Sequence, residues 1–474
     1  MKNPNQRISL QSSIIVLLLF FSACTVGPNY ERPGVAVPSA WKEAQQRDIE
    51  TQSAELTRWW TAFNDPLLDS LVERAVKSNL DLRIAEGRIR EARAARGFTA
   101  ADLWPTVDVS GAYSRSRTSQ NTLSSSSHGG GNLERSLFET GFDAGWEIDL
   151  FGGTRRKVEA ADATLEASVE DRRDLLVTLL GDVARNYISL RGFQSRLAVA
   201  RANLKAQRET LELTQVRFQA GLVSDLDVAQ AEVQVNTTAA EIPILESFLK
   251  QAAYQLDVLL GLQPGSLWNE LVQEAPVPTL PPKILIGLPS ELLRRRPDIR
   301  RVERQLAAAT AQIGAATADL FPKFSLTGVF GLQSISAGDW FTGGSRFWSV
   351  GPTIRWPIFD AGKIRATIEV RNAQQEQALG RYEKTVLTAF QEVESSLVAY
   401  AQEQARYRSL VEAVAANRRA AVMANELYLR GLNDFLNVLV TQRSLYSLEN
   451  DLAQSEATLE LNLVTLYKAL GGGW

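Results

Sequence analysis

The chain has 474 residues, a formal net charge of −3, one cysteine and one histidine. This charge gives no reason to expect nucleic acid or an acidic substrate as a partner. One cysteine excludes a disulfide framework within the chain, and one histidine excludes a histidine-rich metal centre. The histidine, His128, lies in a Ser- and Gly-rich stretch, which argues against a Ser-His-Asp site. No phosphate-cradling Gly-rich motif joins a strand to a helix. We therefore expect no enzyme activity, cofactor or metal site.

The N-terminus has the features of a targeting segment. A positively charged start precedes the apolar run 14–21, which is too short to span a bilayer as a helix. Small residues then lead to the lone cysteine, Cys24, as in the lipobox of bacterial lipoproteins, although Phe21 replaces the usual aliphatic residue. We expect residues 1–23 to be a signal peptide and Cys24 to be lipidated. The alternative is a stray thiol within an ordinary secretion signal. Thr25 in place of Asp favours transport to the outer membrane.

Residues 24–65 are expected to be a lipidated tether, which is rich in proline and docks through Trp59 and Trp60. Asp65 and Pro66 then open a helix, because a proline is tolerated in the first helical turn. Its apolar residues fall on one face as far as about residue 101.

After Trp104-Pro105, the spacing of apolar residues changes from the helical period to every second residue. Apolar and polar residues alternate over about 104–115 and again over 137–149, which predicts a pair of strands. The intervening stretch is rich in Ser, Thr, Asn and Gly, so we expect a solvated loop.

A repeat of seven residues dominates the next part of the chain. Every position of this repeat is apolar, which predicts a helix of about 100 Å from Thr154 to Gln219 with one apolar seam buried along its whole length. Gly221 ends the pattern, and a second seam runs from Val228 to Leu256. A turn this short predicts an antiparallel helical hairpin. The first seam consists of Val169, Leu176, Val183, Leu190, Leu197, Leu204, Leu211 and Phe218.

The same order of patterns occurs twice, which indicates a tandem duplication. The first repeat spans 66–261, a proline-rich linker 262–290, the second repeat 291–470, and a short tail 471–474. The second repeat holds a helix, strands at about 323–335 and 346–358, and a helical hairpin that turns at Gly431. Pro352 lies inside the last of these strands, which is awkward for a ladder.

The strands have the length of tilted membrane-spanning strands, with one apolar face and one polar face. A soluble hairpin in a sandwich is the alternative, but no matching second sheet is apparent. Because four strands cannot close a barrel and lipid does not tolerate open edges, several chains must contribute to one barrel. Three chains would supply twelve strands. The expected fold class is mainly α, with long coiled-coil hairpins and a small transmembrane β part.

The sequence resembles the outer membrane factor family, specifically the NodT-type efflux lipoproteins with the TolC fold. The matching motifs are Cys24-Thr-Val-Gly-Pro-Asn-Tyr-Glu-Arg-Pro33, Trp59-Trp60 with Asp65-Pro66, Gly287-Leu-Pro-Ser-Glu-Leu-Leu-Arg-Arg-Arg-Pro-Asp298, and Pro357-Ile-Phe-Asp-Ala-Gly362. The resemblance implies a homotrimer in the outer membrane of a Gram-negative bacterium. It also implies a 12-stranded trimeric β-barrel in that membrane and a periplasmic α-barrel built from the coiled-coil hairpins. It also implies a periplasmic adaptor (membrane fusion) protein and an inner-membrane efflux transporter of the RND type as partners.

The expected function is a passive trimeric conduit that exports drugs or other small solutes. The alternatives are a lipid-anchored scaffold that bridges the envelope, and an export channel for metal ions or secreted substrates. With only Met1 and Met423, a methionine-lined copper path has no support.

Two sets of site residues follow. Exposed leucines at the hairpin turns suggest contact with the adaptor; these tips are Gly221, Leu222, Val223, Gly431, Leu432 and Asn433. The alternative is that they only form tight helix-ending turns. The resemblance also implies a periplasmic gate at Asp227 and Tyr428, with Asp225, Arg430 and Asp434 as neighbours able to pair. The alternative for Asp225 and Asp227 is that they cap the returning helix. Asn433 and Asn437 depart from the charged residues often found there in the family.

Overall fold

The computed structural model describes residues 25–43, 49–50, 56–117, 119, 134–278 and 284–474. The expected signal peptide, Cys24 and His128 therefore lie outside the described residues. The chain divides into two compact units. The first unit comprises Met1–Pro33, Ile89–Ser168 and Val302–Tyr382, and the second comprises Gly34–Arg88, Val169–Arg301 and Glu383–Trp474.

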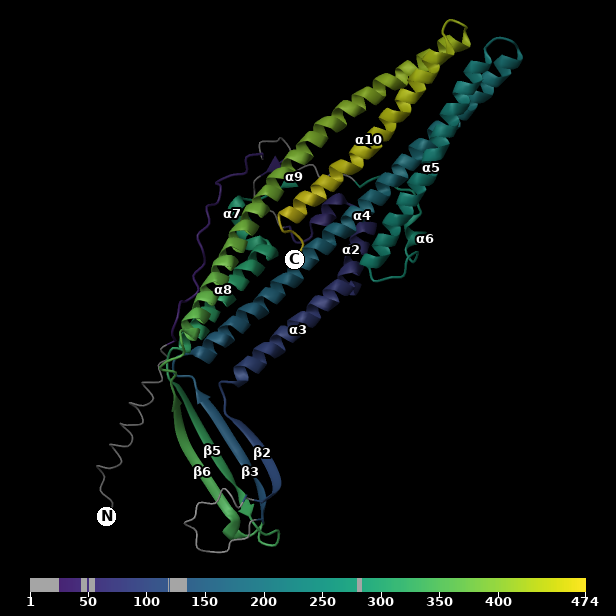
Figure 1. Ribbon diagram of the computed structural model, residues 1–474. Coiled ribbons are helices and arrows are strands. Elements are labelled where there is room, and N and C mark those ends of the chain that lie inside the picture. The colour runs from purple at the N-terminus through teal and green to yellow at the C-terminus, as the bar shows by residue number, and fades with distance from the viewer. Residues whose placement is uncertain (1–24, 44–48, 51–55, 118, 120–133, 279–283) are drawn as a thin grey trace. The chain divides into compact units, whose positions relative to one another are not determined.

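The two halves of the chain contain the same elements in the same order (Figure 1). Each half has two helices, two strands, a helix of 67 residues and, after a short turn, a helix of 35 residues. The first half consists of α2 (Pro66–Ser78), α3 (Leu80–Ala101), β2 (Thr106–Arg117), β3 (Glu134–Ile148), α4 (Gly153–Gln219) and α5 (Asp225–Leu259). The second half consists of α7 (Pro289–Arg295), α8 (Pro297–Ala318), β5 (Lys323–Ser334), β6 (Arg346–Arg355), α9 (Lys363–Leu429) and α10 (Phe435–Ala469). The predicted mainly helical fold and tandem duplication are confirmed.

Five short elements complete the described chain. A 3-10 helix, η1 (Trp59–Phe63), buries both tryptophans of the expected tether. The others are α6 (Trp268–Leu271), η3 (Gly343–Ser345), and a parallel pair formed by β1 (Ile49–Glu50) and β4 (Ile284–Leu285). None of the described helices has both the length and the apolar character that a membrane-spanning helix needs.

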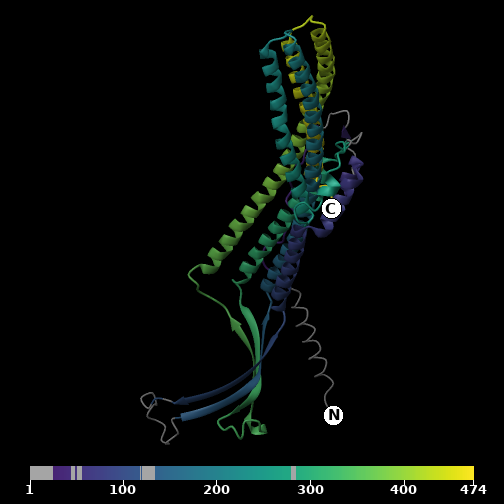
Figure 2. The ribbon, with the colours of Figure 1, turned by 90° about the vertical axis from the view of Figure 1, so that its right-hand side faces the viewer.

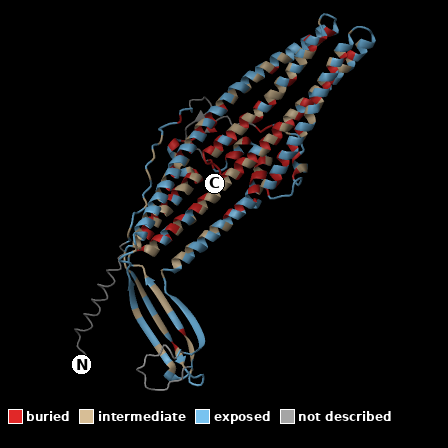
Figure 3. Cartoon of the chain, viewed as in Figure 1, coloured by how far each residue is buried: buried red, intermediate tan, exposed pale blue. Residues whose placement is uncertain are grey.

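The strands form one antiparallel sheet in the first unit, in the order β2-β3-β5-β6. The central pair, β3 and β5, joins the two halves of the chain. The sheet is strongly curved in Figure 2, and most of its residues are exposed or half-buried in Figure 3. Large apolar side chains on it are open, including Val109 and Trp348, each 71% exposed. Pro352 does not interrupt β6, whose ladder with β5 continues through the Leu326–Pro352 pair.

The heptad seam of α4 is buried only over its central part. Val183, Leu190, Leu197 and Leu204 are buried, as the repeat predicts. Phe218, the last position of the repeat, is 43% exposed, so the prediction of a seam buried along the whole helix is wrong at this end. A single protomer supplies too few neighbours near the hairpin turn to cover every position of the repeat.

The helix expected from Pro66 to about Ala101 is interrupted at Asn79, where neither proline nor glycine marks a break. Asn79 has an extended backbone (φ −62°, ψ 132°), which ends α2 at Ser78. This is a correction to the single helix predicted from the sequence, since periodicity alone does not register one extended residue.

Asn79 joins two helices end to end in the second unit. Its Oδ1 accepts hydrogen bonds from the N–H groups of Asp81 (2.9 Å) and Leu82 (3.0 Å), and so caps the start of α3. Its Nδ2 donates to the carbonyl of Leu259, the last residue of α5 (2.9 Å). One buried amide therefore satisfies the end of one helix and the start of the next.

Arg296 occupies the matching junction of the second half, between the end of α10 and the start of α8 at Pro297. Its Nη1 donates to the carbonyl of Ala469, the last residue of α10 (3.0 Å). Its Nε and Nη2 bind Asp298 at 3.0 and 2.7 Å, and Nη1 also binds Glu392 of α9. Burial alone would lower the pKa of Arg296, but Asp298 and Glu392 raise it above its usual value. The guanidinium is thus a charged counterpart of the Asn79 amide.

The C-terminal residues, expected as a tail, pack into the second unit. The indole N–H of Trp474 donates to the carbonyl of Arg295 (2.9 Å), and the ring lies within 4.5 Å of the Arg173 guanidinium and 5.0 Å of that of Arg300. A Cβ added to Gly473 would lie 2.3 Å from Leu180. The glycines therefore allow a close approach that any side chain would prevent.

Candidate functional site

The turns of the two helical hairpins share one backbone design. Gly221 and Gly431 have φ of +70° and +73°, which glycine adopts without strain. The following residue donates its N–H to a carbonyl five residues earlier: Leu222 to Arg217 (2.9 Å) and Leu432 to Leu427 (2.9 Å). These are the bonds of a Schellman motif, which satisfies the last carbonyls of a helix. Figures 1 and 2 both place the two turns at the same end of the second unit.

The structure leaves the leucine of each turn open to solvent. Leu222 is 67% exposed and Leu432 is 71% exposed. One helical turn further on, Leu226 and Leu436 are 64% and 56% exposed. In contrast, Val223 is half-buried and packs against the hairpin interior. The tips therefore combine a rigid turn with an apolar surface that the protomer does not cover.

Asp227 has a local role in the first turn. Its Oδ2 accepts hydrogen bonds from the backbone N–H and the hydroxyl of Ser224, both at 3.0 Å. This contact ties the first turn of α5 to the residue before it, as in a capping box. Asp225 is exposed in the same helical turn, where a carboxylate is favoured by the helix dipole.

The second turn lacks this charged cap. Asp434 precedes α10 without a side-chain capping bond, and the Asn437 amide donates instead to the side chain of Asn433 (2.6 Å). Arg430 and Asp434 are both exposed. Within the described residues, Arg430 forms no ion pair with Asp225, Asp227 or Asp434, so one protomer does not bring these charges together.

Tyr428 is buried in a small apolar cluster near the tips. The cluster, which we call the tip cluster, consists of Ala231, Ala424, Tyr428, Phe435 and Val438. The Tyr428 ring lies 5.4 Å from that of Phe435 at 52°. The Tyr428 hydroxyl is buried and has no hydrogen-bond partner, an arrangement that costs free energy.

Arg217 links the two hairpins through Tyr428, and sequence reasoning missed it. Its guanidinium lies 4.4 Å from the centre of the Tyr428 ring, and its Nη1 donates to the Tyr428 carbonyl (3.0 Å). A cation is favourable there because the carbonyls at the end of α9 carry partial negative charge. The available signal was a basic residue in the last turn of α4. It was overlooked because Arg217 lies beside the seam and not in it.

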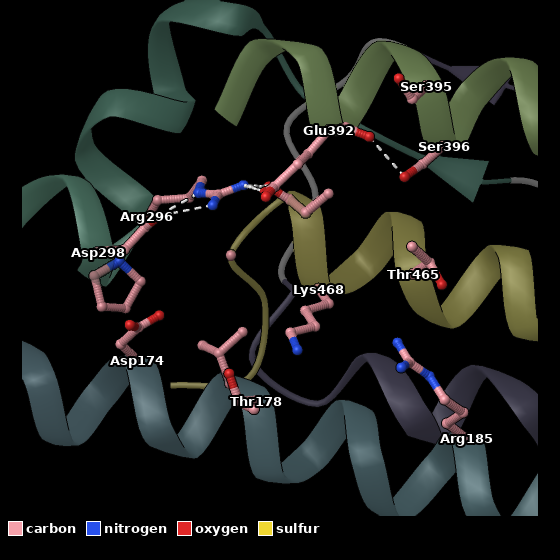
Figure 4. Close-up of a pocket in the computed structure, with 14 residues that line it drawn as sticks. Asp174, Thr178, Arg185, Arg296, Asp298, Glu392, Ser395, Ser396, Thr465 and Lys468 are labelled. Atoms are coloured by element: carbon pink, nitrogen blue, oxygen red, sulfur yellow. Dashed lines mark hydrogen bonds and ion pairs between the residues drawn. The ribbon is translucent and has the colours of Figure 1, made fainter. Parts of the chain in front are cut away.

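A cavity of about 390 Å³ with several charged groups in its lining adjoins the Arg296 junction (Figure 4). Side chains of α4, α9 and α10 line it, with three acidic and three basic groups among them. Burial and the nearby Asp298 raise the pKa of Asp174. No group of three His, Cys, Asp or Glu side chains in the described part of the chain could hold a metal ion. The charged side chains of the cavity are Asp174, Arg185, Arg296, Asp298, Glu392 and Lys468.

Comparison of the sequence with models of protein families assigns the chain to a family. The model of the outer membrane efflux protein family matches residues 71–262 and again 288–472, once in each half. The chain belongs to the outer membrane efflux protein family. The family consists of outer-membrane channels and not of enzymes, in agreement with the sequence analysis.

Individual relatives of this efflux protein span nearly its whole length. Nodulation protein T of Rhizobium leguminosarum bv. trifolii is 33% identical over 96% of both chains. The toluene efflux pump outer membrane protein TtgI of Pseudomonas putida is 34% identical over 96% of this chain and 97% of its own. The solved outer-membrane channel OprN is 38% identical, with a TM-score of 0.90 over 95% of this chain and all of its own. The efflux protein is thus an outer-membrane protein with the TolC fold.

Proposed function

We propose that the chain is the outer-membrane channel of a tripartite efflux system. Three copies form a passive conduit that receives drugs or other small solutes from an inner-membrane transporter of the RND type and a periplasmic adaptor. The observation that carries the proposal is the pairing of a curved four-stranded sheet, whose apolar side chains are exposed, with two helical hairpins whose apolar tips are also exposed. Names of relatives such as a toluene efflux pump protein and a pyoverdine export protein support small-solute export.

The trimer follows from the edges of the sheet. Strands β2 and β6 each leave one row of backbone groups unpaired within the protomer. In lipid such a row must find a partner, and three sheets of four strands make a twelve-stranded barrel, which lies within the range of known barrels. A lipid-anchored scaffold, the second candidate, needs no such strands.

The test is reconstitution of the full mature protein in a planar bilayer. We expect discrete conductance steps and, for the detergent-solubilised protein, the mass of three chains. A trimer without conductance would favour the scaffold, and a single-chain mass would contradict the barrel.

Lipidation of Cys24 is part of the proposal. The first described residues after it are fixed in the first unit: Val26 donates its N–H to the carbonyl of Phe151 (3.2 Å), at the turn between β3 and α4. Arg156 binds the carbonyls of Val26 and Gly27 at 3.2 and 3.3 Å. Mass spectrometry of the mature N-terminus checks the lipidation, and an unmodified cysteine would refute it.

The exposed tips are proposed as the adaptor-docking surface. We expect the double variant Leu222→Asp/Leu432→Asp to lose efflux in a drug-susceptibility assay while remaining trimeric. Both side chains are exposed, so the change in stability should stay within about 0.5 kcal/mol. The matched control is Val272→Asp, a change at a 45% exposed apolar site away from the tips. Efflux that persists in the double variant would mean that the tips only form turns.

Asp227 is proposed as a gate residue in addition to its capping role. A ring of three Asp227 carboxylates would favour cations, so we expect Asp227→Asn to reduce cation selectivity and divalent block. The asparagine oxygen can still accept from Ser224 but carries no charge, so the change should lower helix stability by at most about 1 kcal/mol. Conductance in asymmetric salt, measured beside a thermal melt, separates the roles. Lower stability with unchanged selectivity would leave only the cap. The exposed residues Asp225, Arg430 and Asp434 are proposed to line the same constriction, and Tyr428 to support the gate from the buried tip cluster behind them.

A further inference from the structure

The cavity beside Arg296 contains charged groups that the ion pairs of the junction do not use. Its lining comes from α4, α9 and α10 and from the start of α8, and all the lining residues belong to the second unit. On α4, Asp174, Thr178 and Arg185 are spaced by four and seven residues, so they lie on one face of the helix. This face extends for about 16 Å from Asp174 to Arg185.

The carboxylates of the lining gather at the Arg296 end of the cavity. Asp298 accepts hydrogen bonds from Arg296 at 3.0 and 2.7 Å, and Glu392 also binds Arg296. Asp174 lies beside Asp298 in Figure 4. Arg296 is therefore already engaged by two carboxylates and is not available to a ligand.

Two other cations of the lining have no counter-ion. Lys468 of α10 and Arg185 of α4 form no ion pair and no side-chain hydrogen bond with any residue in the described part of the chain. In Figure 4, Lys468 extends from α10 toward α4, and Arg185 extends from α4 toward α10. Both positive groups thus point into the space between the two helices.

The side chain of Lys468 is fixed by the packing of α10 against α4. A Cβ added to Gly181 of α4 would lie 3.3 Å from Cδ of Lys468 and 3.8 Å from its Cβ and Cγ, so the aliphatic stem lies against this glycine. Lys468 is half-buried as a result. A cation that has lost part of its hydration without gaining a partner costs free energy. A bound anion would supply the missing partner.

The remaining walls of the cavity are suited to an apolar ligand body. Val177, Pro297 and Ala469 are among the lining residues. The volume of about 390 Å³ lies within the range of small-molecule pockets, which combine apolar walls with a few polar groups. A bare inorganic anion would leave these walls uncovered.

We propose that this cavity binds a small organic anion through Lys468 and Arg185. The acidic group of the ligand lies between the two cations, and its apolar body lies against Val177, Pro297 and Ala469. Because only two cations are free, the site favours one acidic group over a highly charged ligand such as a polyphosphate. The site goes beyond the proposed channel function, since it depends on neither the hairpin tips nor the sheet.

Calorimetric titration of the full mature protein with 2-naphthoate, a bicyclic aromatic carboxylate, tests the site. The protein is held in an uncharged detergent, and the same titration into detergent alone gives the blank. We expect saturable binding of one naphthoate per chain. The neutral 2-naphthalenemethanol, which has the same rings, should bind at least about tenfold more weakly because it cannot form charge-assisted hydrogen bonds.

The variants Lys468→Gln and Arg185→Gln should each weaken naphthoate binding about tenfold or more and leave binding of the alcohol unchanged. The matched control is Lys205→Gln, which removes an exposed cation of α4 about 30 Å beyond Arg185 and should bind naphthoate as wild type does. Helical circular dichroism checks that each variant is folded. Arg185 is exposed, so Arg185→Gln keeps the test valid even if Lys468→Gln is unstable.

Four results would overturn the proposal. Naphthoate may show no saturable binding to wild type, or it may bind equally well to the folded variants of both cations. Equal affinity for the alcohol would show that the cations do not contribute. Inorganic phosphate that binds as tightly as naphthoate would show that the apolar walls do not contribute, and would exclude the organic ligand class.

Discussion

Arg296→Ala is expected to lower the free energy of unfolding of the helical part by about 3–5 kcal/mol, the largest effect of any single substitution considered. The Arg296 side chain is only 10% exposed and is bound by Asp298, Glu392 and the carbonyl of Ala469. Removing it leaves the partly buried carboxylate of Asp298 and a helix-terminal carbonyl without their partner. Arg296→Lys should fall between alanine and wild type, because an ammonium keeps the charge but not the planar fork.

Thermal or denaturant unfolding followed by helical circular dichroism measures this loss. The matched control is Arg294→Ala, two residues away on α7, where the side chain is exposed. We expect that control to stay within about 0.5 kcal/mol of wild type. Equal stability of Arg296→Ala and Arg294→Ala would show that the junction does not depend on the guanidinium.

Glu460→Gln is expected to stabilise the protein, and to do so more strongly as the pH rises. Glu460 of α10 is 2% exposed, and its Oε2 has no hydrogen-bond partner. Burial, with the charges of Glu456 and Asp65, raises the pKa of Glu460 to about 9. The unfolded chain loses this proton near pH 4.5 and the folded chain only near pH 9. Between these values the unfolded state binds fewer protons, so stability falls as pH rises.

The loss reaches on the order of 3 kcal/mol at pH 7, since each unit of pKa shift corresponds to about 1.4 kcal/mol. Glutamine is neutral in both the folded and the unfolded state, so Glu460→Gln removes this loss of stability. The melting temperature of Glu460→Gln should therefore exceed that of wild type clearly at pH 8 and hardly at pH 5. Glu412→Gln, at an exposed site of α9, is the control and should show no such trend. A gain independent of pH would mean that Glu460 is ionised in the folded protein.

Much of the fold could be predicted because strong local signals coincide with its boundaries. The seven-residue spacing predicted α4 and α9, and Gly221 and Gly431 marked their ends. The change of period after Trp104-Pro105 indicated the first strand pair, and the repeat of the same order of patterns indicated the second. These signals act within a few residues, so a single sequence is enough to detect them.

What could not be predicted depends on contacts between distant segments. Asn79 interrupts a helix because it can bond to Leu259, which lies 180 residues away. The partner of Arg217 is Tyr428, on the other hairpin. No periodicity reports such pairs. For Phe218, the seam was read correctly, but burial at that end requires neighbours that one protomer does not contain.

The two repeats carry similar residues in the sheet and different residues at the hairpin tips, and this difference bears on how the duplicated chain evolved. In the sheet, equivalent positions of the two repeats hold the same residue: Gly141 and Gly351, and Trp146 and Trp356. At the tips, equivalent positions differ, since Asp227 in the first repeat corresponds to Asn437 in the second. A gene half as long would encode one strand pair and one helical hairpin, and six of its products would supply as many strands and hairpins as the proposed trimer. Fusion of two such genes removes half of the assembly steps. It also frees every second hairpin tip to change, while each strand must still fit its neighbours.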